Sequence, residues 1–331
     1  MTLTVNLPHK TYDITIERGV LARAASYLHL NRRVLIVTDS GVPEIYAQTL
    51  AKQCQTPVIV TIVQGEANKS LASFETLCRT MLENHFTRKD CVVAVGGGVV
   101  GDLAGFAAAS YMRGIDFYNV PTTLLSQVDS SIGGKVAVNF EGLKNIVGAF
   151  YQPSAVLIDP DTLATLDDRQ VASGMAEVIK MAITFDADFF AALETEQPTM
   201  EEIIYRSLQC KRRVVEEDEK EAGLRKVLNF GHTIGHAIES LGGYLHGECV
   251  AMGMLPLCAP GIRERVATVL SRYQLPTAWT GDATALFAAA GHDKKADAAG
   301  VSVVTVPALG SFAFESWSID KLQEYLKEYF S

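Results

Sequence analysis

The sequence predicts an α/β domain followed by a mainly α-helical domain, and three observations indicate this. The 331 residues exceed what one hydrophobic core usually serves, so two domains are expected. The first half alternates short Val/Ile-rich segments with helical patterns, whereas most later segments are long and helical. The character changes at Asp159–Asp168, and we therefore expect domains of residues 1–166 and 167–331.

Five short segments of the first half are predicted to be strands of a parallel sheet. Each is almost continuously apolar, as strands buried on both faces are. The predicted strands are Val34–Thr38, Val58–Val63, Cys91–Val95, Phe117–Val120 and Ala155–Ile158. Helical patterns lie between them at Val42–Gln53, Leu71–His85 and Val99–Tyr111.

The second half is predicted to contain five long helices and little else. These are Asp168–Thr184, Met200–Glu217, Val227–Leu241, Gly247–Gly261 and Ile262–Tyr273. Only Val301–Val306 and Phe312–Phe314 have the pattern of strands there.

Composition excludes several classes of function. A net charge of −9 and a pI near 5.3 disfavour binding to nucleic acid or to an anionic membrane, but a small anionic substrate needs only a local cationic pocket. No apolar stretch is long enough to cross a bilayer, and the N-terminus lacks the pattern of a signal peptide. The six cysteines form no CxxC pair, so we interpret them as reduced core residues of a cytoplasmic protein.

A glycine cluster follows the predicted strand Cys91–Val95. Gly96, Gly98 and Gly101 fit GxGxxG at the start of a helix, where backbone N–H groups can approach a phosphate. The alternative is a tight strand–helix turn without a ligand, because two strands precede this one, whereas the dinucleotide fingerprint normally follows the first strand. Gly133-Gly134-Lys135 adds a second glycine turn with a cation.

Three of the seven histidines lie close together in the second half. His232 and His236 are four residues apart on a predicted helix, hence on one face, and His246 follows a glycine-rich turn. Glu177 and Lys180 share a face of an otherwise apolar helix, where a charged pair is costly without a partner. Two His and one Glu with an open position form a catalytic zinc set, although a purely structural role is the alternative. By spacing alone, His232 and His236 would be the ligand pair.

Several longer motifs together resemble the 3-dehydroquinate synthase family. They are GGGVVGDLAGFAAASYMRG, VPTTLLSQVDSSIGGKVAVNFEGLKNIVGAFYQP, SGMAEVIK, LNFGHTIGHAIES, LHGE and HDKK, spread from about Val34 to Lys295. The resemblance implies a Rossmann-like N-terminal domain and a helical C-terminal domain. It implies conversion of 3-deoxy-arabino-heptulosonate 7-phosphate into 3-dehydroquinate and phosphate in the shikimate pathway, through transient NAD-dependent oxidation, phosphate elimination, re-reduction and aldol cyclisation.

The resemblance also implies roles for individual residues. The cofactors would be NAD and Zn²⁺ (or Co²⁺), with Glu177, His232 and His246 as metal ligands and His236 as a catalytic, substrate-facing residue. NAD contacts would be Asp39, Glu66, Lys69, Gly98, Val99, Val100, Gly101, Asp102, Thr122, Thr123, Lys135, Lys144, Thr162, Leu163, Ala164 and Thr165. Substrate contacts would be Asp129, Lys135, Lys144, Asn145, Lys180, Lys211, Glu221, Arg225, Asn229, Lys294 and Lys295. Arg113 would reach the substrate phosphate of a neighbouring subunit in a homodimer.

The sequence departs from the family pattern at two places. The turn between His236 and His246 is shorter than is usual in the family, and Ala296–Ser331 matches only loosely.

Three rival functions are open. The first is a sister cyclase for sugar phosphates without a carboxylate, which the retention of Lys211, Arg225, Asn229 and the stretch Asp293-Lys294-Lys295 disfavours. The second is a metal-dependent polyol dehydrogenase of the same architecture, which would not need so many cations. The third is a non-catalytic nucleotide- or metal-binding protein, which would have little use for a complete set of polar groups.

Overall fold

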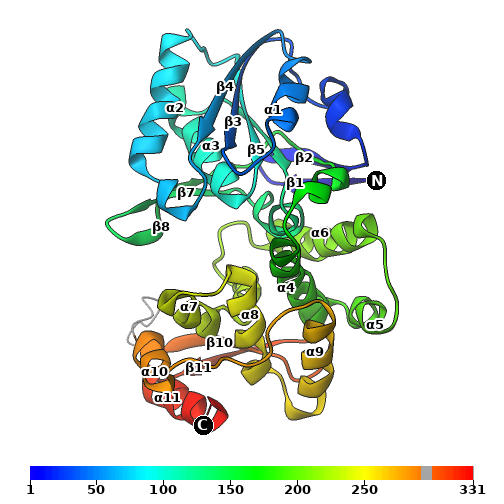
Figure 1. The fold of residues 1–331 in the computed structure, drawn as a ribbon, viewed down its shortest axis with the longest axis vertical. Coiled ribbons are helices and arrows are strands. Elements are labelled where there is room, and N and C mark those ends of the chain that lie inside the picture. Colours follow the sequence, from blue (N-terminus) through cyan, green and yellow to red (C-terminus); the bar gives the residue numbers. More distant parts are fainter. Residues whose placement is uncertain (292–299, 331) are drawn as a thin grey trace. The chain divides into compact units, whose positions relative to one another are not determined.

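The computed structural model describes residues 1–291 and 300–330, and its chain forms two compact units (Figure 1). The first unit comprises Met1–Asp167 and Lys211–Glu219, and the second comprises Asp168–Cys210 and Lys220–Ser331. Lys211, a predicted substrate contact, therefore belongs to the first unit. The predicted contacts Lys294 and Lys295 lie outside the described residues.

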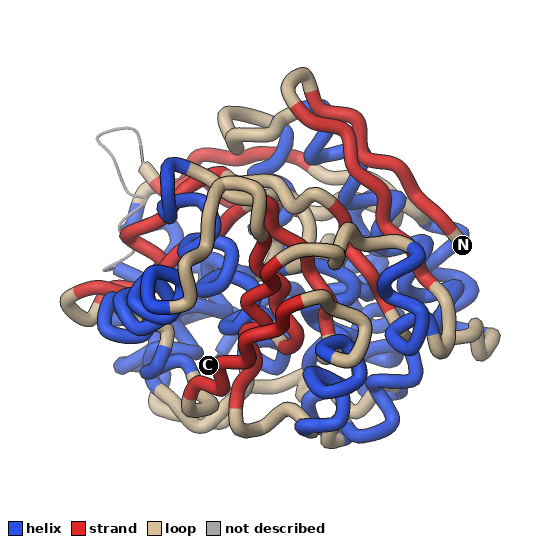
Figure 2. Tube along the Cα trace, turned by 90° about the horizontal axis from the view of Figure 1, so that it is seen from above, coloured by secondary structure: helices blue, strands red, loops and turns tan. Residues whose placement is uncertain are grey.

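The first unit is built on a seven-stranded sheet of order β1-β2-β9-β6-β5-β3-β4. All neighbours pair in parallel except β1 and β2, which form the antiparallel hairpin at the N-terminus (Figure 2). The strands are β1 (Thr2–Leu7), β2 (Lys10–Ile16), β3 (Arg33–Asp39), β4 (Thr56–Ile62), β5 (Cys91–Gly96), β6 (Asp116–Pro121) and β9 (Ala155–Ile158).

Helices cover both faces of this sheet, which explains its continuously apolar central strands. On one face Leu35 and Val92 pack against Leu77 of α2 (Leu71–Glu83) and Leu103 of α3 (Gly98–Ser110). On the other face Ile36 and Val93 pack against α1 (Glu44–Ala51) and η1 (Val20–Ser26). Figure 1 shows α1 opposite α2 and α3 across the strands. A strand buried on both faces cannot alternate polar and apolar residues.

A separate two-stranded hairpin packs beside α3. It consists of β7 (Lys135–Phe140) and β8 (Leu143–Phe150), which pair antiparallel. Short helical turns complete the unit: η2 (Glu66–Asn68), η3 (Tyr111–Arg113), η4 (Ser126–Ser130) and η5 (Pro160–Thr165).

The second unit is mainly helical. Its long helices are α4 (Asp168–Phe185), α5 (Ala187–Thr195), α6 (Met200–Glu217, which runs into the first unit), α7 (His232–Leu241), α8 (His246–Met254), α9 (Pro260–Arg272), α10 (Ala283–Gly291) and α11 (Ile319–Phe330). The remaining elements are η6 (Leu224–Asn229), η7 (Leu255–Leu257) and the antiparallel pair β10 (Val301–Thr305) and β11 (Ala313–Trp317).

The predicted fold class is confirmed, with differences in individual elements. All five predicted parallel strands are present within one or two residues of their expected ends. The expected helix Val227–Leu241 is broken at Gly231, whose φ of 78° is left-handed, so α7 begins at His232. The expected helix Gly247–Gly261 ends at Met254, because Pro256 and Pro260 interrupt its hydrogen bonding.

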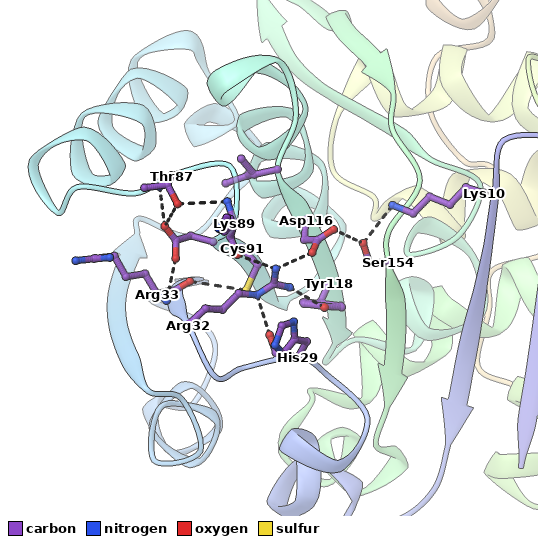
Figure 3. Close-up of polar contacts among 12 residues, drawn as sticks. Lys10, His29, Arg32, Arg33, Thr87, Lys89, Cys91, Asp116, Tyr118 and Ser154 are labelled. Atoms are coloured by element: carbon purple, nitrogen blue, oxygen red, sulfur yellow. Dashed lines mark hydrogen bonds and ion pairs between the residues drawn. The ribbon is translucent and has the colours of Figure 1, made fainter.

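The amino ends of the parallel strands are tied together by one buried arginine (Figure 3). The Arg32 guanidinium donates to the carbonyl oxygens of His29 and Lys89 at 2.8 and 3.0 Å. It also donates to Asp116 Oδ2 at 2.7 Å and to the Tyr118 hydroxyl at 2.8 Å. These groups precede or begin β3, β5 and β6, so a single side chain fixes how three strands start.

Among the described residues, every helix is too short or too polar to cross a lipid bilayer.

Candidate metal centre and dinucleotide site

A buried glutamate is the centre of a candidate metal site in the second unit. Glu177 lies on α4, its side chain is 1% exposed, and neither carboxylate oxygen accepts a hydrogen bond within the described part of the chain. Desolvating a carboxylate without such bonds is costly, so this group requires cationic neighbours. The Lys180 ammonium, one helical turn later on α4, is one such neighbour and also donates to the Leu228 carbonyl oxygen at 2.7 Å.

Two imidazoles face the same carboxylate oxygen. The Nε2 atoms of His232 and His246 each lie 3.7 Å from Glu177 Oε1. His232 Nδ1 lies 3.1 Å from the Phe230 carbonyl oxygen, an acceptor that places the ring proton on Nδ1 and leaves Nε2 free. One carboxylate oxygen and two imidazole nitrogens, all within 4.8 Å of one another, form a set that could hold a divalent ion.

The helices carrying these side chains approach closely because glycines line their contacts. A Cβ on Gly253 of α8 would lie 2.2 Å from the Gly231 carbonyl oxygen at the start of α7. A Cβ on Gly247 would lie 2.0 Å from the Ser173 carbonyl oxygen of α4. Backbones at this distance bring the first turns of α7 and α8 to Glu177, which fixes where His232 and His246 stand.

The electrostatics of the cluster suit a metal. Burial would raise the pKa of Glu177, but the Lys180 ammonium and the two imidazoles hold it well below its usual range. Burial, together with Lys180, lowers the pKa of His232 well below its usual value, so this imidazole is neutral. Burial also disfavours charge on His246, but the carboxylates of Glu177 and Glu239 outweigh it and raise the pKa of His246 to about 9. A bound cation would therefore displace a proton from His246.

His236 belongs to a different group from the Glu177 cluster. It is exposed on α7, and its ligand atoms fall within 4.8 Å of those of Glu239 and His246, not of Glu177. Its ring centroid lies 5.2 Å from that of His232 and 6.1 Å from that of His246. The i, i+4 spacing therefore identified neighbouring rings but not the pair that faces the glutamate.

The other predicted polar residues of the second unit lie around η6. Arg225 is 2% exposed, which is rare for arginine unless its charge is compensated. Asn229 donates to Glu221 Oε1 at 2.9 Å, and Glu221 itself has a left-handed φ of 60°. This segment leads directly into His232, as the sequence indicated.

In the first unit, the predicted dinucleotide contacts gather at one edge of the sheet. Asp39 ends β3, Gly96 ends β5, and Thr122 follows β6. The segment 66–69 follows β4, and the segment 162–165 follows β9. Carboxyl ends of parallel strands share an edge, and that edge is where ligands of open α/β sheets bind.

The glycine cluster forms the turn between β5 and α3. Gly97 precedes α3 and offers no side chain to cap it, so the first N–H groups of this 13-residue helix remain available to an anion. A Cβ on Gly98 would lie 3.1 Å from Ser130 Oγ, which is buried and makes no hydrogen bond within the described part of the chain. A cavity of about 10 Å³, room for one water, lies beside it and is lined by Gly101, Asp102, Ser130 and Lys135.

Other predicted NAD contacts are held by hydrogen bonds to nearby residues. Asp39 Oδ1 accepts the Gly41 N–H at 2.8 Å, and the Thr162 hydroxyl donates to the Asp159 carbonyl oxygen at 2.8 Å. Thr123 Oγ1 accepts the Ser126 N–H at 3.2 Å, and Thr165 shares a 2.9 Å hydrogen bond with the Tyr46 hydroxyl. These bonds give the sheet edge a defined shape.

Lys69 connects residues that were predicted to contact different ligands. Its ammonium is 5% exposed and donates to Asp102 Oδ2 and Asn145 Oδ1, each at 2.5 Å. Burial raises the pKa of Asp102, and the Lys69 charge opposes this. A predicted NAD contact thus joins Asp102 of the α3 turn to Asn145 of the β7–β8 hairpin.

The remaining predicted substrate residues of the first unit are partly paired and partly exposed. Lys211 donates to the Asp129 carbonyl oxygen at 2.5 Å and lies 2.7 Å from its carboxylate. Lys135, Lys144 and Arg113 are exposed. Met112 and Arg113 both adopt left-handed φ values, 49° and 67°, which is uncommon for consecutive residues other than glycine.

Glu239 and Asn139 contact predicted site residues and were not identified from the sequence. Glu239 lies 3.2 Å from His246 Nδ1 through Oε2, and Asn139 contacts the backbone of Asn145. Glu239 follows His236 by three residues on α7, a spacing that places it on the same helix face and could have identified it. Asn139 lies inside a quoted motif, but nothing in its spacing separates it from its neighbours.

Comparison with known proteins decides the family. Models of the 3-dehydroquinate synthase N-terminal and C-terminal regions match residues 59–173 and 174–296. The chain belongs to the 3-dehydroquinate synthase family. Members named 3-dehydroquinate synthase include one from Streptococcus sanguinis, 42% identical with 99% of this chain and 100% of the relative covered. Another, from Enterococcus faecalis, is 42% identical with 98% of each covered.

Solved structures support the same architecture. A 2-deoxy-scyllo-inosose synthase complexed with carbaglucose-6-phosphate, NAD⁺ and Co²⁺ superposes with a TM-score of 0.88 at 26% identity, covering 99% of each chain. The 2-epi-5-epi-valiolone synthase of Streptomyces hygroscopicus, with NAD⁺ and Zn²⁺ bound, gives 0.87 at 28% identity over 98% of each. A probable glycerol dehydrogenase of Sinorhizobium meliloti gives only 0.62 at 17% identity over 95% of each, which is a likeness of fold alone.

Proposed function

We propose that this chain converts 3-deoxy-arabino-heptulosonate 7-phosphate into 3-dehydroquinate and phosphate, as a phosphate-eliminating carbon–oxygen lyase of the shikimate pathway. The observation that carries the proposal is the buried Glu177 carboxylate, which accepts no hydrogen bond in the described part of the chain and faces two imidazole nitrogens. Relatives 42% identical over nearly the whole chain bear the name of this activity.

The residues of the second unit fit a zinc or cobalt ion. Glu177, His232 and His246 would hold it, because they offer one oxygen and two nitrogens and leave a coordination position open. The first unit would hold NAD along the carboxyl edge of its sheet, with the dinucleotide phosphates at the start of α3. When bound, the metal supplies charge stabilisation at substrate hydroxyls, and NAD supplies a reversible acceptor of hydride.

The chain's own residues would bind, orient and protonate the substrate. Lys211 and Arg225 suit its carboxylate, since both are buried cations that could compensate a desolvated anion. Lys135, Lys144 and Asn145 suit its phosphate, with Lys294 or Lys295 as a further contact.

Other residues would control charge and protonation in the site. Lys180 would keep Glu177 ionised through its ammonium charge, and exposed His236 would move protons at a substrate hydroxyl. Asp129, Glu221 and Asn229 would orient these groups through their hydrogen bonds.

We also propose a cytoplasmic homodimer in which Arg113 reaches the neighbouring subunit's substrate phosphate. Arg113 is exposed and adjoins Met112, which is 42% exposed. The β7–β8 hairpin presents further apolar side chains, with Phe140, Ile146 and Phe150 exposed by 45, 56 and 44%. Exposed apolar groups on a strand with an unpaired edge are a common basis of association between chains.

The test is phosphate release from 3-deoxy-arabino-heptulosonate 7-phosphate by purified protein with NAD⁺ and zinc, while NADH is followed by absorbance. We expect phosphate and dehydroquinate in equal amounts and no net NADH. Glu177→Ala is expected to lose the metal by elemental analysis, and Arg225→Ala to lower kcat/KM. Accumulation of NADH with simple polyols, or full metal content in Glu177→Ala, would contradict the proposal.

A sister cyclase is the second candidate, favoured by the high TM-scores of two such enzymes. These enzymes would act on sugar phosphates that lack the carboxylate, so buried Arg225 distinguishes the two functions. Turnover of a carboxylate-free heptulose phosphate, with no loss of rate in Arg225→Ala, would favour the sister activity.

A further inference from the structure

The β7–β8 hairpin contains an irregularity at the position of Lys144 and Asn145. Val138 pairs with Val147, and Phe140 pairs with Leu143. Between these pairs β7 contributes one residue, Asn139, whereas β8 contributes three: Lys144, Asn145 and Ile146. A bulge of this kind redirects side chains and is common beside functional sites.

Asn139 bonds to the bulge through its side-chain oxygen and to the segment 66–69 through its nitrogen atoms. Its side-chain oxygen accepts the Asn145 N–H at 2.9 Å, and its own backbone N–H donates to the Lys69 carbonyl oxygen at 2.8 Å. Its side-chain amide nitrogen donates to Glu66 twice, to Oε1 at 2.9 Å and to the carbonyl oxygen at 3.2 Å. One side chain therefore joins the bulge to the segment 66–69 that follows β4.

The conformation of Asn145 requires such support. Its φ is 57°, a left-handed backbone that costs free energy in residues other than glycine, although asparagine tolerates it better than most. Two hydrogen bonds hold it there: the N–H to Asn139 and the side-chain oxygen from Lys69 at 2.5 Å. The exposed Lys144 side chain beside it is oriented by the same bulge.

We propose that Asn139 is the positioning residue that holds the Lys144–Asn145 bulge in the conformation that receives the substrate's phosphate group, and that it ties this bulge to the dinucleotide-binding segment at Glu66. The inference rests on the proposed function, since it takes Lys144 and Asn145 as phosphate contacts and Glu66 as an NAD contact. Asn139 itself touches neither ligand. It acts through the backbone of Asn145 and the side chain of Glu66.

Two substitutions separate these two contacts. Asn139→Ala removes the acceptor for the Asn145 N–H and the donor to Glu66. Asn139→Asp keeps an acceptor for Asn145 but sets a second carboxylate beside that of Glu66. Asn84→Ala is the matched control, because Asn84 is exposed and its side chain donates to the Thr80 carbonyl oxygen at the end of α2, away from the bulge. The measurements are steady-state kinetics with the heptulosonate phosphate at saturating NAD, the Kd for NAD, and amide exchange of residues 141–147.

For Asn139→Ala we expect KM to rise roughly three- to tenfold, as for one lost hydrogen bond, with kcat changed less than about twofold. Exchange of residues 141–147 should become faster and the Kd for NAD should rise. Asn139→Asp should keep KM and exchange near wild type while still raising the Kd for NAD. Asn84→Ala should match wild type throughout.

Unchanged KM and unchanged exchange in Asn139→Ala would overturn the proposal. So would an Asn139→Asp variant whose KM and exchange are as impaired as those of Asn139→Ala, because the retained acceptor would then be irrelevant. If the wild-type protein binds NAD but releases no phosphate, the proposed function fails, yet the exchange comparison still decides whether Asn139 holds the bulge. A wild-type protein that binds no NAD would overturn the link to Glu66.

Discussion

His246 has a carboxylate on each side of its ring: Glu239 Oε2 lies 3.2 Å from Nδ1, within hydrogen-bond distance, and Glu177 Oε1 lies 3.7 Å from Nε2. A carboxylate that accepts the far N–H of a ligand histidine fixes its tautomer and increases its basicity toward a metal. We therefore expect Glu239→Ala to weaken zinc binding roughly 10- to 100-fold. Glu239→Gln should weaken it less, because the amide oxygen can still accept the N–H. Competition with a chromogenic chelator measures both affinities without reference to activity.

The control for Glu239 is Glu264→Gln, an exposed glutamate of α9 in the same unit. It should leave zinc affinity at the wild-type value. If Glu239→Ala binds zinc as tightly as wild type, the Glu239 carboxylate does not support the metal site.

At the scale of single residues, the sequence predicted which side chains belong to the metal site better than it predicted which of them lie next to one another. The three histidines and Glu177 were identifiable because charged and imidazole groups stand out in apolar helices. Spacing alone paired His232 with His236, and the resemblance replaced His236 by His246. The structure places His246 opposite Glu177 because the break at Gly242 and Gly243 turns α8 back against α4, a tertiary contact that local spacing does not encode.

Among the elements, the contact between α7 and α8 depends on Gly253. An added Cβ would lie 2.2 Å from the Gly231 carbonyl oxygen, so the helices would have to separate. We expect Gly253→Ala to lower the free energy of unfolding of the second unit by about 2–4 kcal/mol and to reduce bound zinc. Thermal unfolding and elemental analysis measure these effects.

Gly261→Ala provides the matched comparison for Gly253. Gly261 lies in α9, and an added Cβ would meet nothing within 4 Å among the described residues outside its own helix turn. This change should be neutral or stabilising by up to about 1 kcal/mol, because alanine favours helix. Equal stability of the two variants would show that α7 and α8 can move apart without loss of stability.

The hydrogen bonds of Arg32 predict that this side chain stabilises the parallel sheet (Figure 3). The Arg32 side chain is 9% exposed and satisfies two carbonyl oxygens, a carboxylate and a hydroxyl. Arg32→Ala leaves these acceptors partly buried without donors, so we expect a loss of about 2–4 kcal/mol in chemical denaturation. Arg79→Ala, which breaks an exposed i, i+4 pair with Glu75, should change stability by less than about 0.5 kcal/mol. A similar effect of the two changes would contradict this reading of the network.

Some elements of the first unit were predictable and others were not, for a physical reason. The strands β3, β4, β5, β6 and β9 were predictable, since their unbroken Val/Ile runs reflect burial on both sides. The hairpins β1–β2 and β7–β8 were not predicted. The outer strand β8 is largely exposed, with a glycine and several polar residues, so its sequence has no clear apolar period. The bulge in β8 is hydrogen-bonded by Asn139 of the neighbouring strand and by Lys69, and Lys69 is too far away in the sequence for a local pattern to indicate the contact.

At the scale of the whole molecule, the sequence was sufficient for the fold class and the family, because long motifs cover most of the chain. The family resemblance also implied that one subunit completes the site of another through Arg113, and this stays a prediction. Arg113 is exposed and adjoins Met112, an apolar side chain that is 42% exposed. A homodimer with twofold symmetry would exchange the same side chain in both directions.

Subunit complementation tests that arrangement directly. Arg113→Ala and Glu177→Ala should each abolish most activity as homodimers, the first by removing the cation and the second by removing the metal ligand. A heterodimer of the two variants, co-expressed with different tags and purified on both, should regain about half of wild-type activity, because one of its two sites then has Glu177 in one subunit and Arg113 from the other. If Arg113 instead served its own subunit, neither site would be complete, and the heterodimer would be as inactive as its parents. A protein that sediments as a monomer at assay concentration would rule out the exchange altogether.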